Sequence, residues 1–82
     1  MRIDKYLKVS RLIKRRTVAS DACDGEHISV NGKVVKPSYN VKVGDEIAIR
    51  FGQRTLVVRV TATTEHIGKA EASSMFEVIS QD

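Results

Sequence analysis

Apolar positions in the first twenty-five residues recur with the spacing of a helix. At about 100° per residue, Ile3, Tyr6, Leu7 and Ser10 fall on one arc roughly 100° wide. Asp4 is a residue type that favours the N-cap or first turn of a helix. The pattern therefore predicts a short amphipathic helix that begins near Asp4 and buries this arc.

A second short helix is predicted before residue 25. Thr17 is expected to cap its N-terminus, and Gly25 follows the last apolar residue, where glycine often ends a helix. Small side chains are expected to face inward, at Val18, Ala19, Ala22 and Cys23.

After Gly25 the apolar period changes from helical to two, as in strands. Asn31-Gly32, between two alternating runs, predicts a hairpin with a type I′ turn. Strands are expected at 27–30, 33–36, 46–51, 56–60 and 75–79, with a polar loop over 61–74. The predicted fold is α+β, with two packed N-terminal helices on a small, bent, mostly antiparallel sheet of four to five strands. We expect one domain, 1–82, with C-terminal strands within 55–79.

Composition limits the possible chemistry. The chain has 82 residues, of which 41% are hydrophobic and 29% charged, as in a small folded domain. Its single cysteine, Cys23, excludes an internal disulfide, and with His27 and His66 it falls short of a metal site. No catalytic constellation or apolar targeting segment is visible. We therefore expect a soluble, cytoplasmic, non-enzymatic protein without a cofactor.

Positive charge is concentrated at the N-terminus. The first sixteen residues carry seven Lys/Arg and one Asp, whereas the other sixty-six carry seven Lys/Arg and nine Asp/Glu. A concentrated cationic surface on an ordered scaffold is typical of proteins that bind phosphate backbones. Tyr6 is expected in the core and only Tyr39 is available for base stacking, so RNA shape and backbone should dominate recognition.

Four motifs, "RIDKYL", "RRTVA", "ISVNGKVV" and "VGDEI", occur in this order within residues 2–50. Together they resemble the RNA-binding domain named after small-subunit ribosomal protein S4, also called the αL RNA-binding motif. The resemblance implies an RNA-binding surface on the two helices and the start of the hairpin. With the cationic residues, the expected RNA-binding set is Arg2, Lys5, Lys8, Arg11, Lys14, Arg15, Arg16, Thr17, Asn31 and Lys33.

The segment "MRIDKYLKVSRLIKRRTVA" more closely resembles the RqcP family of small bacterial ribosome quality control factors. That resemblance implies a monomer that binds the 50S subunit obstructed by peptidyl-tRNA and contacts 23S rRNA and the P-site tRNA. It also implies a partner, an RqcH-like factor, that adds alanine tails to the stalled chain. Two alternatives remain open: a heat-shock-type factor that recycles free 50S subunits, and a structural ribosomal protein.

Several residues have structural interpretations beside the functional ones. Asp4 is expected to cap the helix or pair with a neighbouring arginine, and Arg16 either contacts RNA or caps the first helix. Arg2 is expected to be a free N-terminal arm, and Gly44-Asp45 only a turn. The family usually has glycine two residues before the first apolar strand residue, where this chain has Glu26, so the turn there is expected to differ.

Overall fold

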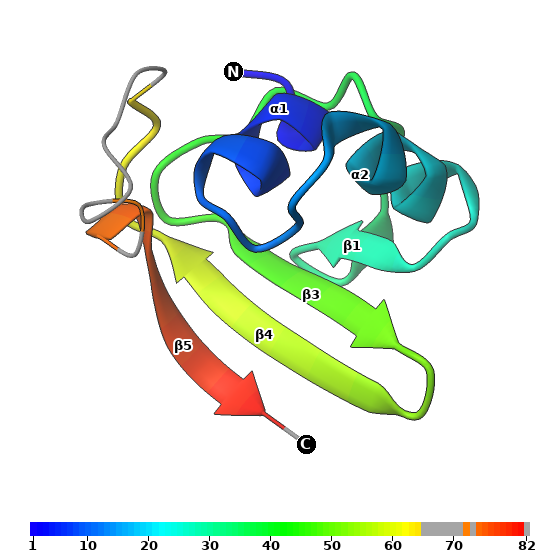
Figure 1. Ribbon diagram of the computed structural model, residues 1–82. Coiled ribbons are helices and arrows are strands. Elements are labelled where there is room, and N and C mark those ends of the chain that lie inside the picture. The colour runs from blue at the N-terminus through cyan, green and yellow to red at the C-terminus, as the bar shows by residue number, and fades with distance from the viewer. Residues whose placement is uncertain (65–71, 73, 82) are drawn as a thin grey trace.

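The computed structural model describes residues 1–64, 72 and 74–81, in which two helices precede five strands (Figure 1). The predicted order of elements is confirmed, and the polar loop expected over 61–74 lies largely outside the described residues. The elements are α1 (Ile3–Val9), α2 (Arg16–Asp24), β1 (Ile28–Val30), β2 (Lys33–Val34), β3 (Glu46–Phe51), β4 (Arg54–Val60) and β5 (Phe76–Gln81).

The strands form one antiparallel sheet in the order β2-β1-β3-β4-β5. The two helices lie over β1 and the first part of β3, while the β3–β4 turn and the end of β5 extend past them (Figure 1). Phe51, on the core-side face at the end of β3, consequently stays 49% exposed, and Val78, on the edge strand β5, is 54% exposed. The helices and the far end of the sheet thus meet at a step in the surface.

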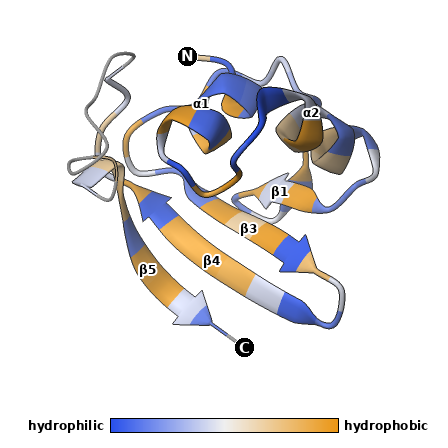
Figure 2. Ribbon diagram, in the orientation of Figure 1, coloured by the Kyte–Doolittle hydropathy of each residue, from blue (hydrophilic) through white to orange (hydrophobic). Residues whose placement is uncertain are grey.

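The core forms where the helices meet the sheet. Ile3, Tyr6, Leu7 and Ser10 are all buried, which confirms the predicted arc of the first helix. The Tyr6 hydroxyl donates a 2.6 Å hydrogen bond to the carbonyl of Met75, just before β5. Burial of this ring raises the pKa of the Tyr6 hydroxyl well above its ordinary value. Figure 2 shows the matching hydrophobic stripes along β3 and β4.

The hairpin between β1 and β2 has the predicted turn. Asn31 has φ 51° and Gly32 has φ 86°, the two positive values that a type I′ turn requires. Val30 pairs with Lys33 across it, so the register follows directly from the turn. Here the sequence signal and the structure agree residue by residue.

The start and inner face of α2 differ from the prediction. The helix begins at Arg16, Arg15 occupies the N-cap without a side-chain cap bond, and Thr17 lies in the first turn. Val18 is 50% exposed, whereas Ala19 and Cys23 are buried. A helix this short buries only the stripe that faces α1 and the sheet, and Val18 lies outside it.

The link from α2 to β1 explains the unusual glycine position. Glu26, not Gly25, has the left-handed conformation, with φ 63°, while Gly25 has φ −81° as the C-cap of α2. Gly25 instead makes room for the next ring, because a Cβ there would lie 2.9 Å from Cδ2 of His27. The predicted change in turn geometry therefore takes the form of a non-glycine residue in a conformation that favours glycine.

Candidate RNA interface

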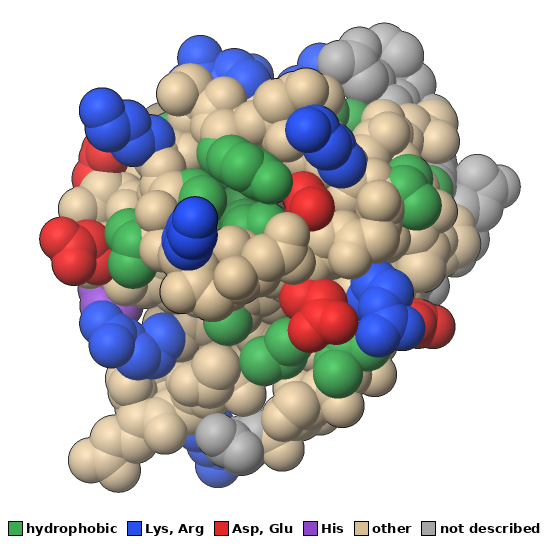
Figure 3. All heavy atoms as spheres, turned by 180° about the vertical axis from the view of Figure 1, so that it is seen from behind, with side chains coloured by type: hydrophobic (Ala, Val, Ile, Leu, Met, Phe, Trp, Pro, Cys, Tyr) green, Lys and Arg blue, Asp and Glu red, His purple; other side chains and the backbone are tan. Residues whose placement is uncertain are grey.

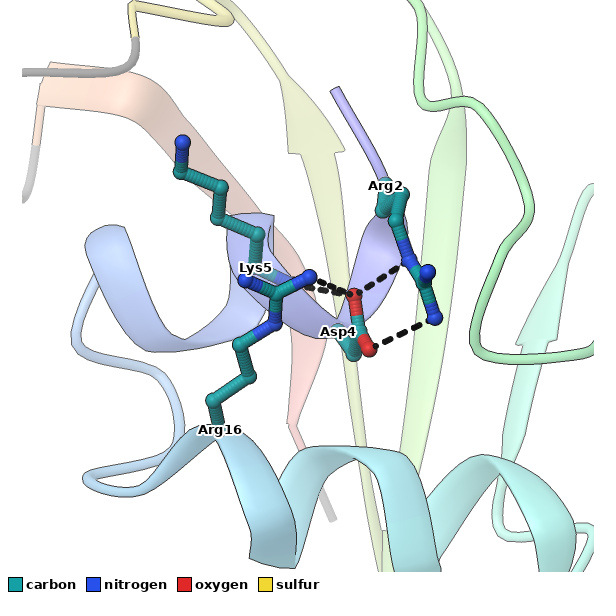
Figure 4. Close-up of polar contacts among 4 residues, drawn as sticks. All are labelled: Arg2, Asp4, Lys5 and Arg16. Atoms are coloured by element: carbon teal, nitrogen blue, oxygen red, sulfur yellow. Dashed lines mark hydrogen bonds and ion pairs between the residues drawn. The ribbon is translucent and has the colours of Figure 1, made fainter.

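The centre of the site is a buried carboxylate held between two arginines. Asp4 accepts hydrogen bonds from Nε and Nη2 of Arg2, at 3.3 and 3.2 Å, one to each carboxylate oxygen (Figure 4). Nη2 of Arg16 forms an ion pair with Oδ1 of Asp4 at 3.5 Å. The Asp4 side chain is 5% exposed, whereas those of Arg2 and Arg16 are 53% and 47% exposed. We call Arg2, Asp4 and Arg16 the arginine clamp.

Local structure brings the clamp together. Asp4 lies in the first turn of α1, where the backbone N–H of Lys5 donates to Oδ1 at 2.7 Å and the helix dipole favours a negative charge. Arg16 is the first residue of α2. The carboxylate therefore links the N-terminal ends of both helices, which fulfils the expectation that Asp4 pairs with a neighbouring arginine.

The Asp4 carboxylate also affects the pKa of Cys23, on the buried face of α2. Burial, followed by the nearby charges of Asp4 and Asp24, raises the pKa of the Cys23 thiol to about 11. A thiol with so high a pKa stays protonated and acts as a small apolar side chain. Cys23 therefore belongs to the packing of the site and not to its reactive groups.

The clamp leaves donors for a further ligand. A guanidinium has five N–H donors, and the fork to Asp4 uses two of those on Arg2. The side chains of Arg2 and Arg16 are each about half exposed, which leaves them accessible to a further ligand. Planar, forked donors held in place are suited to bridging phosphate oxygens.

Arg2 differs from its predicted state as a free arm. Its backbone forms an isolated antiparallel bridge with Asn40, and its side chain is fixed to Asp4. Arg16 is bound to the same carboxylate instead of capping the carbonyls of α1. Both residues therefore have a structural partner and an exposed cationic edge at once.

Other predicted cations extend from the clamp along α1. The Lys5 side chain points away from the Asp4 carboxylate (Figure 4), and Lys8 is exposed one turn further on. Arg11 follows the helix with φ 65°, and its N–H donates to the carbonyl of Lys8 at 3.1 Å. Glycine usually occupies this left-handed position after a helix, since other residues are strained there by about 1–2 kcal/mol. Arg11 thus keeps a cationic side chain at an unfavourable backbone position.

The remaining predicted residues on the helices lie at the junction between them. Lys14, Arg15, Arg16 and Thr17 are all exposed, with Arg15 extended at φ −123° as the N-cap of α2. We call the Lys and Arg side chains on α1, on the link between the helices and at the start of α2 the cationic face. It is made of Arg2, Lys5, Lys8, Arg11, Lys14, Arg15 and Arg16.

The hairpin tip has a structural network that the sequence did not indicate. The Asn31 side chain donates to Oδ1 of Asp45 at 3.2 Å and accepts from the N–H of Glu46 at 3.0 Å. Asp45 also accepts from the Tyr39 hydroxyl at 3.0 Å and from the N–H of Lys42 at 3.0 Å. Asp45 is thus more than a turn residue. It is a buried acceptor that fixes the loop beside the hairpin.

Two expectations change with this network. Tyr39 is not a free loop side chain, because its partly buried ring packs against the core and its hydroxyl donates to Asp45. Burial and this bond raise the pKa of the Tyr39 hydroxyl. Asn31 has both polar atoms of its side chain engaged within the fold. Lys33, at the start of β2, is exposed. No signal in the sequence joins Asn31, Tyr39 and Asp45, since each has an independent explanation as a turn or loop residue.

The outer side of the sheet has a different electrostatic character. Arg59 donates to Glu77 at 2.7 Å and to Glu46 at 3.4 Å across adjacent strands. On the face turned away from the viewer of Figure 1, Asp and Glu side chains lie among Lys and Arg (Figure 3). A polyanion is therefore favoured by the cationic face and not by this mixed surface.

Comparison with known proteins identifies the family of this chain. The S4 domain model matches residues 1–47, which include both helices, the first hairpin and the start of β3. The chain is 54% identical over 78 residues to the RQC P-site tRNA stabilizing factor of Halalkalibacterium halodurans, with 95% of this chain and 89% of that protein covered. The chain belongs to the family of RQC P-site tRNA stabilizing factors.

Another relative and a solved structure extend the comparison. The RQC P-site tRNA stabilizing factor of Bacillus subtilis is 46% identical over 82 residues, covering 100% of this chain and 95% of that one. Heat shock protein 15 of Vibrio cholerae has the same fold, with a TM-score of 0.89 at 28% identity, over 96% of this chain and 81% of that structure. Family membership confirms both the expected S4-type fold and the expected class of ribosome quality control factors.

In the described part of the chain, the helices of seven and nine residues are each too short to cross a bilayer.

Proposed function

We propose that this protein stabilises the P-site tRNA on an obstructed large ribosomal subunit, through its cationic face. The arginine clamp is the observation that supports this most strongly. It presents two guanidinium groups in fixed orientations on adjacent helices, which suits two RNA backbones that meet at an angle. The names of the family members place those proteins at a P-site tRNA.

The finer contacts belong to the same proposal. One edge of the cationic face binds 23S rRNA and the other the tRNA, by backbone and shape more than by base identity. The protein acts as a monomer in the cytoplasm, without catalysis of its own. By holding the tRNA in place it supports alanine addition by an RqcH-like partner.

Cosedimentation tests the proposal. Purified protein is mixed with large subunits that carry a P-site peptidyl-tRNA, with empty large subunits and with intact 70S ribosomes. We expect strongest association with the tRNA-loaded large subunit, weaker association with the empty one and least with 70S. Equal association with loaded and empty subunits would contradict a tRNA contact, and a stoichiometric place on 70S ribosomes would indicate a structural ribosomal protein.

A second candidate is a recycling factor of the heat-shock type, favoured by the structural match to heat shock protein 15. It binds the same subunit but does not serve a tailing partner. Deletion of the gene separates the two functions: loss of alanine tails on stalled chains supports the quality control role, and unchanged tails support recycling.

A further inference from the structure

An apolar groove opens beside the cationic face, between α2 and the far end of β3. It has a volume of about 370 Å³, and its walls include Leu12, Val18, Ala22 and Phe51. It lies at the step where the sheet extends past the helices. Lys14, a member of the cationic face, lines it as well.

Two large apolar side chains in this groove are about half exposed to solvent. Phe51 is 49% and Val18 50% exposed, in a chain that has only two phenylalanines. Phe51 has the same orientation in β3 as the buried Ile47 and Ile49, but the helices do not reach it. An aromatic ring left open on an otherwise apolar wall provides a stacking surface.

The charged residues that line the groove favour a negatively charged ligand. Lys14 and Arg50 line it together with His27, and none of the described residues that line it is Asp or Glu. A cationic rim around an apolar, partly aromatic floor is complementary to a nucleotide, whose base is flat and apolar and whose phosphate is anionic. A phosphate backbone bound to the cationic face reaches the groove at Lys14 without crossing a carboxylate of the lining.

We infer that this groove holds one unstacked RNA base, with a flanking phosphate on Lys14. The inference rests on the proposed RNA-binding function and adds a base contact to a surface otherwise specialised for backbone. Stacking on an aromatic side chain contributes enough to change affinity by roughly tenfold or more per base. A single-stranded or bulged nucleotide fits this site, whereas a continuous duplex does not.

The test compares fluorescein-labelled single-stranded oligoadenylate with an abasic strand of the same length and charge. Wild-type protein is expected to bind oligoadenylate roughly tenfold more tightly than the abasic strand. Phe51→Ala should remove this preference, Phe51→Trp should keep it, and Val43→Ala, at another exposed apolar residue, should leave it unchanged. Circular dichroism checks that each variant folds.

The outcomes separate this inference from the proposed function. If Phe51→Ala keeps the preference while Arg16→Ala weakens binding to both strands, the base site is wrong and the RNA-binding role stands. If neither strand binds wild-type protein, both fail. Equal affinity for the two strands, together with loss of large-subunit binding in Phe51→Ala, would make the groove a protein contact and overturn the base site.

Discussion

The carboxylate of Asp4 and the guanidinium of Arg16 lie 3.5 Å apart and join the first turns of the two N-terminal helices. Arg2 binds the same carboxylate from the other side. An acidic residue within a surface for a polyanion is unfavourable by simple electrostatics. Its position implies that orientation of the two arginines outweighs the local loss of positive charge.

This balance predicts an inverted effect for Asp4→Asn. The substitution raises the net charge by one, so charge alone predicts tighter RNA binding. Since the amide holds guanidinium groups less strongly than a carboxylate does, we expect binding to large subunits to weaken by roughly three- to tenfold. Asp21→Asn, an exposed site on α2, makes the same charge change and should bind as tightly as wild type or more so. Tighter binding by Asp4→Asn would show that the clamp does not position its arginines.

Glu26 provides a test of backbone strain away from the RNA surface. Because Glu26 has φ 63°, Glu26→Gly should stabilise the protein by about 0.5–1 kcal/mol, after the greater chain entropy of glycine is included. Urea denaturation measures the difference. Glu26→Ala is the control, since it removes the carboxylate but keeps the unfavourable conformation. If the glycine variant is no more stable than the alanine variant, the backbone at Glu26 is not strained.

Cys23 should be unreactive in the folded protein. With a pKa of about 11 and a buried side chain, its alkylation by iodoacetamide at pH 8 should be more than about a hundredfold slower than in urea. Burial raises the pKa of the folded Cys23 thiol above its ordinary value of 9.0, so the associated stability is present below pH 9 and lost as pH rises through about 11. Equal alkylation rates in buffer and in urea would contradict this burial.

Asp45 should be important for the hairpin and its adjoining loop. Asp45→Ala leaves the Tyr39 hydroxyl and the side-chain amide of Asn31 without their acceptor, and we expect a loss of about 2–3 kcal/mol in unfolding free energy. Tyr39→Phe removes one of these bonds and should lose about 1 kcal/mol. If the unfolding free energy of Asp45→Ala lies within about 0.5 kcal/mol of that of wild type, this hydrogen-bond network does not stabilise the protein.

The parts of the fold that could be predicted from the sequence are those that depend on local residue patterns. The arc of Ile3, Tyr6 and Leu7 follows from helical geometry, and the Asn31-Gly32 turn follows from the conformations these two residues tolerate. Each signal lies within a few residues of its effect. The exposure of Val18 depends instead on how far the sheet extends under α2, which no local pattern records.

The site could be predicted as a set of cations but not as an arrangement. The charge pattern predicts that Arg2 and Arg16 contact RNA, while their shared contact with Asp4 depends on the packing of one helix against the other. The left-handed backbone conformations of Arg11 and Glu26 could not be predicted for a different reason, because neither is a residue type that favours this conformation. The structure thus turns a charge cluster into an oriented surface.

The affinity of Arg2→Ala and Arg16→Ala for large subunits carrying a P-site tRNA, measured over a range of salt concentrations, tests the central claim most directly. Arg59→Ala, on the outer side of the sheet, removes the same charge as a control. We predict that both clamp variants fold, bind roughly tenfold more weakly and each reduce the salt slope by about one, while Arg59→Ala matches wild type. Folded Arg2→Ala and Arg16→Ala proteins that bind as tightly as wild type would contradict the account.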